Sequence, residues 1–166
     1  MKKDNRGLSM MEMIIVVAIM AIVVGGVFVG VGLITGKPAE KCANKLVSFM
    51  QRNRVTTMGK LDSYLEIYME ADGGKQYLCV KEFIKTEDGA GYVATQTRIG
   101  EADVEVWYST DGTSYVQLGT SPLKISYDRS SGAFKDCCKK IEIKKGNKTV
   151  VLELVQRTGK IIMTVN

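Results

Sequence analysis

Residues 7–34 read GLSMMEMIIVVAIMAIVVGGVFVGVGLI, and this stretch sets the organisation of the chain. From Met13 to Ile34 no residue carries a charge. That length is enough for one helical crossing of about 30 Å of hydrocarbon. Val and Ile dominate the run and favour strands in water, but in lipid only a helix satisfies its own backbone hydrogen bonds. We therefore expect a transmembrane helix here.

The residues before this run are basic. Lys2, Lys3 and Arg6 stand there against one acid, Asp4. Basic residues that precede an apolar helix hold that end in the cytoplasm. The pattern predicts a single-pass protein of the cytoplasmic membrane whose later residues form an extracytoplasmic head.

Glu12 stands at the start of the apolar run and helps to choose among three interpretations of the N-terminal segment. A secretory signal peptide would need a short apolar region and a small-residue cleavage site, for which Gly30-Val31-Gly32 is the candidate. A plain single-span anchor is the second interpretation. Neither explains Glu12, because a carboxylate at the centre of a membrane helix costs about 2.5–3.5 kcal/mol and is a functional hypothesis by default.

The third interpretation is a resemblance to the leader of a type IV prepilin. A basic stretch ends at Gly7, Glu12 is the fifth residue after it, and the apolar helix follows at once. The resemblance implies that residues 1–7 are a class III leader, that prepilin peptidase cuts between Gly7 and Leu8, and that Leu8 is N-methylated. Leu8 stands where this family usually has Phe.

The resemblance also implies partners and a location. These are other pilin subunits, prepilin peptidase, an inner-membrane assembly platform, and membrane lipid before assembly. After assembly the protein would lie in a cell-surface or periplasmic filament.

Glu12 has the right spacing to act in assembly. Cleavage would create a charged α-amine on Leu8, and a residue four positions later lies one helical turn away on the same face. Glu12 can neutralise this amine or that of a neighbouring subunit, where two poorly solvated charges would pair. The alternative is that Glu12 only reaches out to the lipid headgroups.

Residues 37–59 form a second helical pattern, which is amphipathic. Pro38 suits a first helical turn, and Gly59 suits a C-terminal stop. Joined to the transmembrane segment, residues 8–36, the helix would be roughly 75 Å long. The apolar positions at helical spacing are Ala39, Cys42, Ala43, Leu46, Phe49 and Met50.

Residues 60–166 change to a period of two, which predicts an antiparallel β-rich head in one sheet or two. The expected fold class is α+β, with the long N-terminal helix packed on this head, as in the pilin fold. Strands are expected at 62–70, 76–84, 92–99, 102–109, 115–118, 123–128, 141–144, 149–156 and 160–165. Ala71-Asp72-Gly73-Gly74 predicts a hairpin turn between the first two of them.

This part of the chain also resembles the GspH/FimT-type minor pilins and pseudopilins. The resemblance covers most of residues 39–166 and rests on hydrophobic spacing and glycines. The residues that carry it are Arg52-x-Arg54 near the helix end, Ile125-Ser126-Tyr127-Asp128 with Gly132, and Thr158-Gly159-Lys160-Ile161.

Four cysteines, Cys42, Cys79, Cys137 and Cys138, are candidates for disulfides, because an exported head permits them. Four cysteines allow three complete pairings, and the adjacent Cys137 and Cys138 are not expected to bond to each other. The other interpretation of Cys79 is a small buried hydrophobic residue. No Cys-x-x-Cys occurs, so we expect neither a zinc site nor another metal site.

Composition and motifs argue against an enzyme. The chain has 45% hydrophobic and 25% charged residues, which are globular values, but no His. It contains neither Gly-x-Ser-x-Gly nor a P-loop. We expect no catalysis and no cofactor.

Lysines gather near the C-terminus and raise the question of DNA binding. Phosphates bind such clusters, but aromatic residues for base stacking are absent from the region. A solvated hairpin with lysine-protected edges is the preferred interpretation. The candidate DNA contacts are Lys139, Lys140, Lys144, Lys145 and Lys148.

The sequence thus predicts a structural subunit of a type IV pilus, type II secretion or DNA-uptake filament, more specifically a minor pilin or pseudopilin. The alternative is a single-span, membrane-anchored extracytoplasmic binding protein that does not enter a filament.

Overall fold

The computed structural model describes residues 10–21, 37–59, 62–86 and 88–166. The chain divides into two compact units, Met1–Thr35 and Gly36–Asn166. In the first unit, residues 10–21 are helical. None of the helices within the described ranges is both long enough and apolar enough to cross a membrane. The second half of the predicted transmembrane helix, and its predicted continuity with the amphipathic helix, fall on residues 22–36 and lie outside the described residues.

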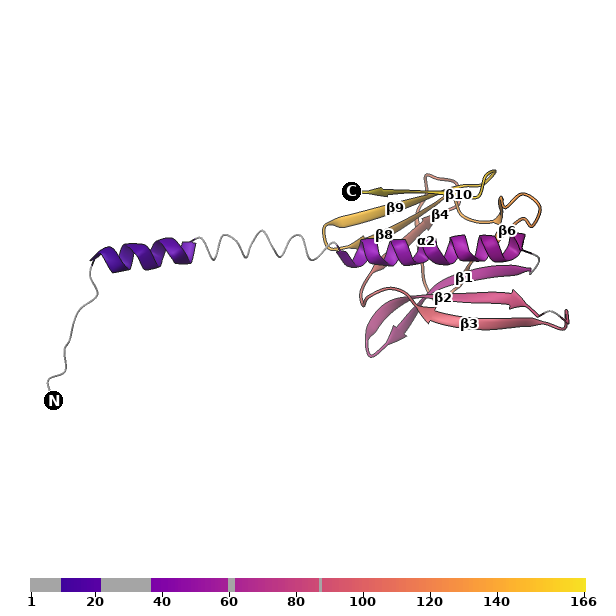
Figure 1. Ribbon diagram of the computed structural model, residues 1–166, viewed down its shortest axis with the longest axis horizontal. Helices are drawn as coiled ribbons and strands as arrows, with labels where there is room; N and C mark the ends of the chain where they lie inside the picture. Colours follow the sequence, from indigo (N-terminus) through magenta and orange to yellow (C-terminus); the bar gives the residue numbers. More distant parts are fainter. Residues whose placement is uncertain (1–9, 22–36, 60–61, 87) are drawn as a thin grey trace. The chain divides into compact units, whose positions relative to one another are not determined.

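In the second unit, the described residues form one helix and two antiparallel sheets (Figure 1). This confirms the α+β class and resolves the open choice in favour of two sheets. Helix α2 spans Lys37–Met58. The first sheet has the order β3-β2-β1-β6-β7, with β1 Ser63–Asp72, β2 Lys75–Lys85, β3 Tyr92–Arg98, β6 Leu123–Tyr127 and β7 Phe134–Asp136. The second sheet has the order β10-β9-β8-β4-β5, with β4 Glu105–Ser109, β5 Val116–Gln117, β8 Lys140–Lys145, β9 Lys148–Val155 and β10 Lys160–Val165.

The apolar stripe of α2 lies between the two sheets. The helix contacts β1, β2 and β6 of the first sheet and β8 and β9 of the second. Of the six apolar positions predicted for the stripe, only Phe49 is not fully buried. Leu65 and Ile67 complete the core from one sheet, and Ile141 and Leu152 from the other. Burial of this stripe, rather than helix propensity, holds α2 in place.

The hairpin predicted between the first two strands forms at Gly73 and Gly74. Their φ angles are 58° and 78°, and a two-residue loop with two positive φ angles matches the twist of the strands that it joins. Asp72 pairs with Lys75 across the turn.

Two predictions about the strands were wrong. The strand expected from Ala102 begins only at Glu105, because Asp103 has a φ of 59° and donates its N–H to Gln76 O at 2.9 Å. Strand β7 was not expected, since it has three residues and two of them are charged.

The C-terminal end of α2 contacts a loop of each sheet, the β9–β10 turn and the β6–β7 loop. Arg54 Nη2 donates to Thr158 O at 3.0 Å, and Arg54 Nη1 donates to Gly159 O at 3.4 Å. A Cβ built on Gly159 would overlap the carbonyl oxygen of Gly132, and both glycines have positive φ angles, 64° and 67°. We call Arg54, Gly132, Thr158 and Gly159 the α2 clamp. It brings together residues from all three segments that carried the GspH/FimT resemblance.

Candidate functional site

The residues predicted for processing and assembly belong to the first unit. Gly7 and Leu8 lie outside the described residues. Glu12 lies in the helix at residues 10–21, and its side chain is exposed. Its predicted pairing with the Leu8 amine therefore stays a prediction.

Glu12 is the sole charged residue in a helix that is otherwise apolar on all sides. Among residues 10–21, Met11, Ile14 and Val17 are all exposed to more than half. A helix that is hydrophobic all round is normally buried in lipid or against other helices. In such surroundings an ionised carboxylate requires a partner of opposite charge.

Comparison with known families agrees with this interpretation. Residues 2–28 match the family described as the prokaryotic N-terminal methylation motif. The match includes Gly7, Leu8 and Glu12. Neither the curated proteins nor the solved structures contain a significant match to the chain.

The chain therefore carries a type IV prepilin-like class III signal peptide. The motif, which covers residues 2–28, supports a type IV pilin-like N-terminal segment. The α+β unit with one N-terminal helix on antiparallel sheets is consistent with a pilin-like fold.

The four cysteines are free thiols in the structure. Cys137 is half-buried and the others are buried. Burial raises the pKa of Cys42 and of Cys138 to about 12. These thiols are therefore protonated at neutral pH, and protonated thiols are poor nucleophiles. Over the described residues, no group of three or more Cys, Asp or Glu side chains could hold a metal ion.

We expect alkylation of the denatured, unreduced protein to add four groups to the chain, one per cysteine. In the native protein at neutral pH, Cys137 should react first, because it alone is not fully buried. Intact-mass spectrometry after treatment with iodoacetamide measures both. Two adducts in the denatured protein would instead reveal one disulfide.

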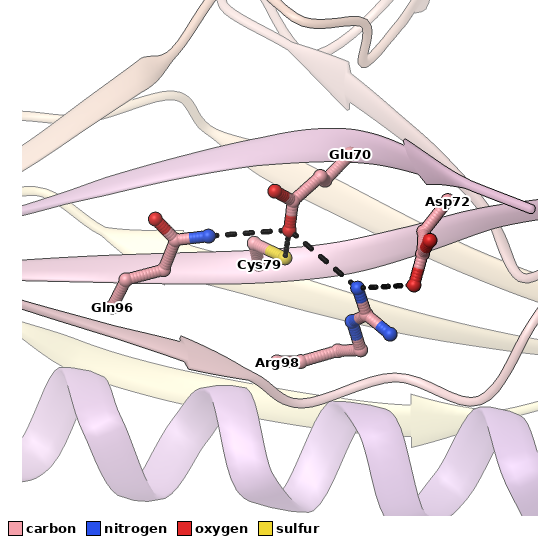
Figure 2. A network of polar contacts seen from close by, with 5 residues as sticks. All are labelled: Glu70, Asp72, Cys79, Gln96 and Arg98. Atoms are coloured by element: carbon pink, nitrogen blue, oxygen red, sulfur yellow. Dashed lines mark hydrogen bonds and ion pairs between the residues drawn. The ribbon is translucent and has the colours of Figure 1, made fainter.

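Cys79 belongs to a polar network on the face of the first sheet that is turned away from α2 (Figure 2). Its Sγ donates to Glu70 Oε2 at 3.1 Å, and Gln96 Nε2 donates to the same oxygen at 3.1 Å. Arg98 Nη2 lies 3.8 Å from Glu70 Oε2 and 3.1 Å from Asp72 Oδ2. We call these five residues the β3 anchor, because they join β3 to β1 and β2.

The position of Cys79 in the β3 anchor makes its thiol a weaker acid than a free cysteine. Burial, followed by the hydrogen bond to Glu70, raises the pKa of Cys79 to about 11. Cys79 is thus buried, as one interpretation of the sequence held, but it is a hydrogen-bond donor rather than part of the apolar core.

The lysines predicted as DNA contacts are largely occupied by local contacts. Lys139 Nζ donates to Asp111 O at 2.9 Å. Lys145 Nζ donates to two carbonyl oxygens, those of Ala102 and Asp103. Lys144 Nζ lies 2.9 Å from Glu142 Oε2. A nucleic-acid phosphate would have to displace these contacts at three of the five lysines, so the DNA contact stays a prediction, and Lys140 and Lys148 are its remaining candidates.

The first sheet also carries a cleft of about 330 Å³ beside β6. Tyr92 Oη donates to Asp62 Oδ2 at 2.9 Å, and Ser126 Oγ donates to Asp136 Oδ2 at 2.7 Å. These pairs use polar groups that a ligand would otherwise bind. The sequence pointed to neither the cleft nor the β3 anchor, because both depend on which strands become neighbours.

Proposed function

We propose that the chain is a structural subunit of a filament of the type IV pilus, type II secretion or DNA-uptake class. Prepilin peptidase cuts it between Gly7 and Leu8, and the N-terminal helix then docks among the helices of neighbouring subunits. The observation that carries this proposal is the match of residues 2–28 to the N-terminal methylation motif. The apolar helix with Glu12 as its one charge supports it.

The driving force for assembly follows from the charges at the new N-terminus. In the bilayer the Leu8 amine and the Glu12 carboxylate are both poorly solvated. In a bundle of helices each amine can meet a carboxylate of a neighbour, and such a pair is far more favourable than either buried charge alone. The head, residues 37–166, is then displayed around the bundle.

Mass spectrometry of the mature N-terminus tests the processing step directly. A chain that begins at Leu8 supports the filament subunit. A chain that begins at Met1 or near Gly32 supports the alternative, a single-span anchored binding protein whose head holds a ligand.

We expect Glu12→Ala to leave cleavage and membrane insertion intact but to reduce incorporation into filaments. In lipid the substitution removes a costly charge. In the filament it leaves the amine of a neighbouring subunit unpaired in apolar surroundings, which costs about 3–5 kcal/mol. Sheared filaments and membranes, separated and probed with an antibody to the head, give the ratio of the two pools.

Two further variants control this experiment. Glu12→Gln keeps the size of the side chain without its charge and should behave like Glu12→Ala, whereas Glu12→Asp keeps the charge and should retain much of the wild-type ratio. The total number of filaments is counted in parallel, because a subunit that nucleates assembly would lower it. Equal ratios for all four proteins would mean that Glu12 only reaches the headgroups.

A narrower form of the proposal is a minor subunit of the GspH/FimT type. It rests on the resemblance of residues 39–166, whose quoted residues meet in the α2 clamp. Quantitative mass spectrometry of purified filaments tests it, since a minor subunit is present in few copies relative to the main pilin.

A further inference from the structure

Each sheet of the head has one long edge strand. β3 ends the first sheet and β10 ends the second. The opposite edges, β7 and β5, have three and two residues. β3 and β10 have seven and six, with no Pro and no acidic residue. Long, weakly charged edges of this kind are templates for another strand, and proteins usually protect them.

The hydrogen bonds on either side of β3 identify its free backbone groups. Ile99 N donates to Leu78 O, and Thr86 N donates to Gly91 O, both at 2.9 Å. Antiparallel pairs alternate between bonded and non-bonded residues, so the odd-numbered residues of β3 bond to β2. The N–H and C=O groups that face away from β2 belong to Tyr92, Ala94, Gln96 and Arg98.

The same reasoning applies to β10. Thr149 and Asn166 exchange two hydrogen bonds, at 3.0 and 2.9 Å. The even-numbered residues of β10 therefore bond to β9. The N–H and C=O groups of Ile161, Met163 and Val165 face away from it.

Both edges also leave apolar side chains uncovered on their inner faces. Val93 is 59% exposed, Met163 41% and Val165 40%. Their register partners, among them Leu152 and Val150, place them on the faces that form the core. Each sheet thus extends its core face beyond the part that α2 covers.

We propose that β3 of one subunit pairs in parallel with β10 of a second copy of this chain, so that heads join edge to edge. The inference rests on the proposed filament function. In Figure 1 the two strands lie at opposite borders of the head, and their arrows point in the same direction. Subunits that all point in the same direction can therefore join through two different edges, β3 of one and β10 of the next. Repetition of such a heterologous contact gives an open helical assembly.

Parallel pairing also fits the faces of the two sheets. In the register that sets Ala94 beside Ile162 on the outer face, Thr95 lies beside Met163 on the core face, so that the two core faces are continuous. Antiparallel pairing would join the core face of one sheet to the outer face of the other.

The β3 anchor prepares β3 for this contact. Gln96 and Arg98 bond to Glu70 and Asp72 of β1 (Figure 2), so β3 is held straight before a partner arrives. An edge that is already ordered loses less conformational entropy on binding. A subunit present in few copies would lack such neighbours, so this contact and the minor, GspH/FimT-type role exclude each other.

Cysteine cross-linking in intact filaments tests the pairing. A chain with Thr95→Cys and Met163→Cys together is expressed in place of the wild type, and the filaments are oxidised. The expected result is a ladder of dimers, trimers and longer species on a non-reducing gel. Wild type gives the background, since three of its four cysteines are buried. The matched control combines Thr95→Cys with Ile162→Cys, whose side chains lie on opposite faces, and should give no ladder.

The remaining outcomes overturn the inference. Dimers from Thr95→Cys alone would mean that β3 pairs with β3 of a second subunit. Dimers from Met163→Cys alone would mean that β10 pairs with β10 of a second subunit. Normal filaments from the double variant without a ladder would leave the filament proposal standing and exclude this contact. Failure of the protein to begin at Leu8 or to enter filaments would instead refute the filament proposal, and with it the contact.

Discussion

Gly159→Ala is expected to lower the free energy of unfolding of the head by about 3–6 kcal/mol. Gly159 has a φ of 64°, which disfavours any residue with a Cβ. The added methyl group would also overlap the carbonyl oxygen of Gly132, a backbone atom that no rotamer change can move. Relief of this overlap requires the last hairpin to move away from the loop between β6 and β7, and so disturbs the α2 clamp. Urea unfolding of the detergent-solubilised chain, followed by the fluorescence of its one tryptophan, Trp107, measures the loss.

Gly146→Ala is the matched control. Gly146 has a φ of 60°, almost that of Gly159, but no atom lies within 4 Å of its Cβ position. We expect it to cost about 1–2 kcal/mol, the price of the backbone conformation alone. The difference between the two variants isolates the contact in the α2 clamp. Equal losses would mean that the Gly132–Gly159 approach does not constrain the head.

Gly7→Val is expected to leave the uncleaved precursor in the membrane. A peptidase must bring its catalytic groups to the peptide bond after residue 7, and a glycine without a side chain permits that approach. A branched side chain at this position blocks it. Intact-mass spectrometry of the membrane fraction distinguishes the precursor from the product that begins at Leu8.

Leu8→Phe controls for a general disturbance of the leader. It changes the other side of the same bond to the residue that type IV prepilins usually carry, so we expect normal cleavage. Processing of Gly7→Val at the wild-type level would refute the assignment of residues 1–7 as the leader.

Local sequence patterns were sufficient to predict most elements of the head, with β7 and the start of β4 as the exceptions. The helix expected from Pro38 to Met58 is α2, because burial at a spacing of three and four residues leaves a clear periodic pattern. Gly73 and Gly74 predicted the first hairpin for another local reason, since a turn with two positive φ angles restricts the residues that form it. The leader was also predictable, since its basic residues, its Gly and its Glu are read in linear order, and the family match covers them.

Contacts between residues far apart in the chain could not be predicted from the local sequence pattern. Gln96 and Arg98 bond to residues 26 positions earlier, and nothing in the local pattern states which strand will lie beside β3. β7 was missed because its pairing with β6, rather than its own composition, makes it a strand. The late start of β4 depends on Asp103, whose backbone N–H donates a hydrogen bond to the carbonyl oxygen of Gln76 in the first sheet. The sequence pattern therefore lacked the information about which strands pair with each other.

Arg54 is synthesised long before the carbonyl groups that it holds. Thr158 follows 104 residues later, an interval of roughly 5–20 s at about 5–20 residues per second. For most of this time Leu46 and Met50 have no β8 or β9 beside them, so the growing chain leaves the side of α2 that these strands later cover exposed. A chaperone or the membrane surface can bind this apolar side until the last strands have been made.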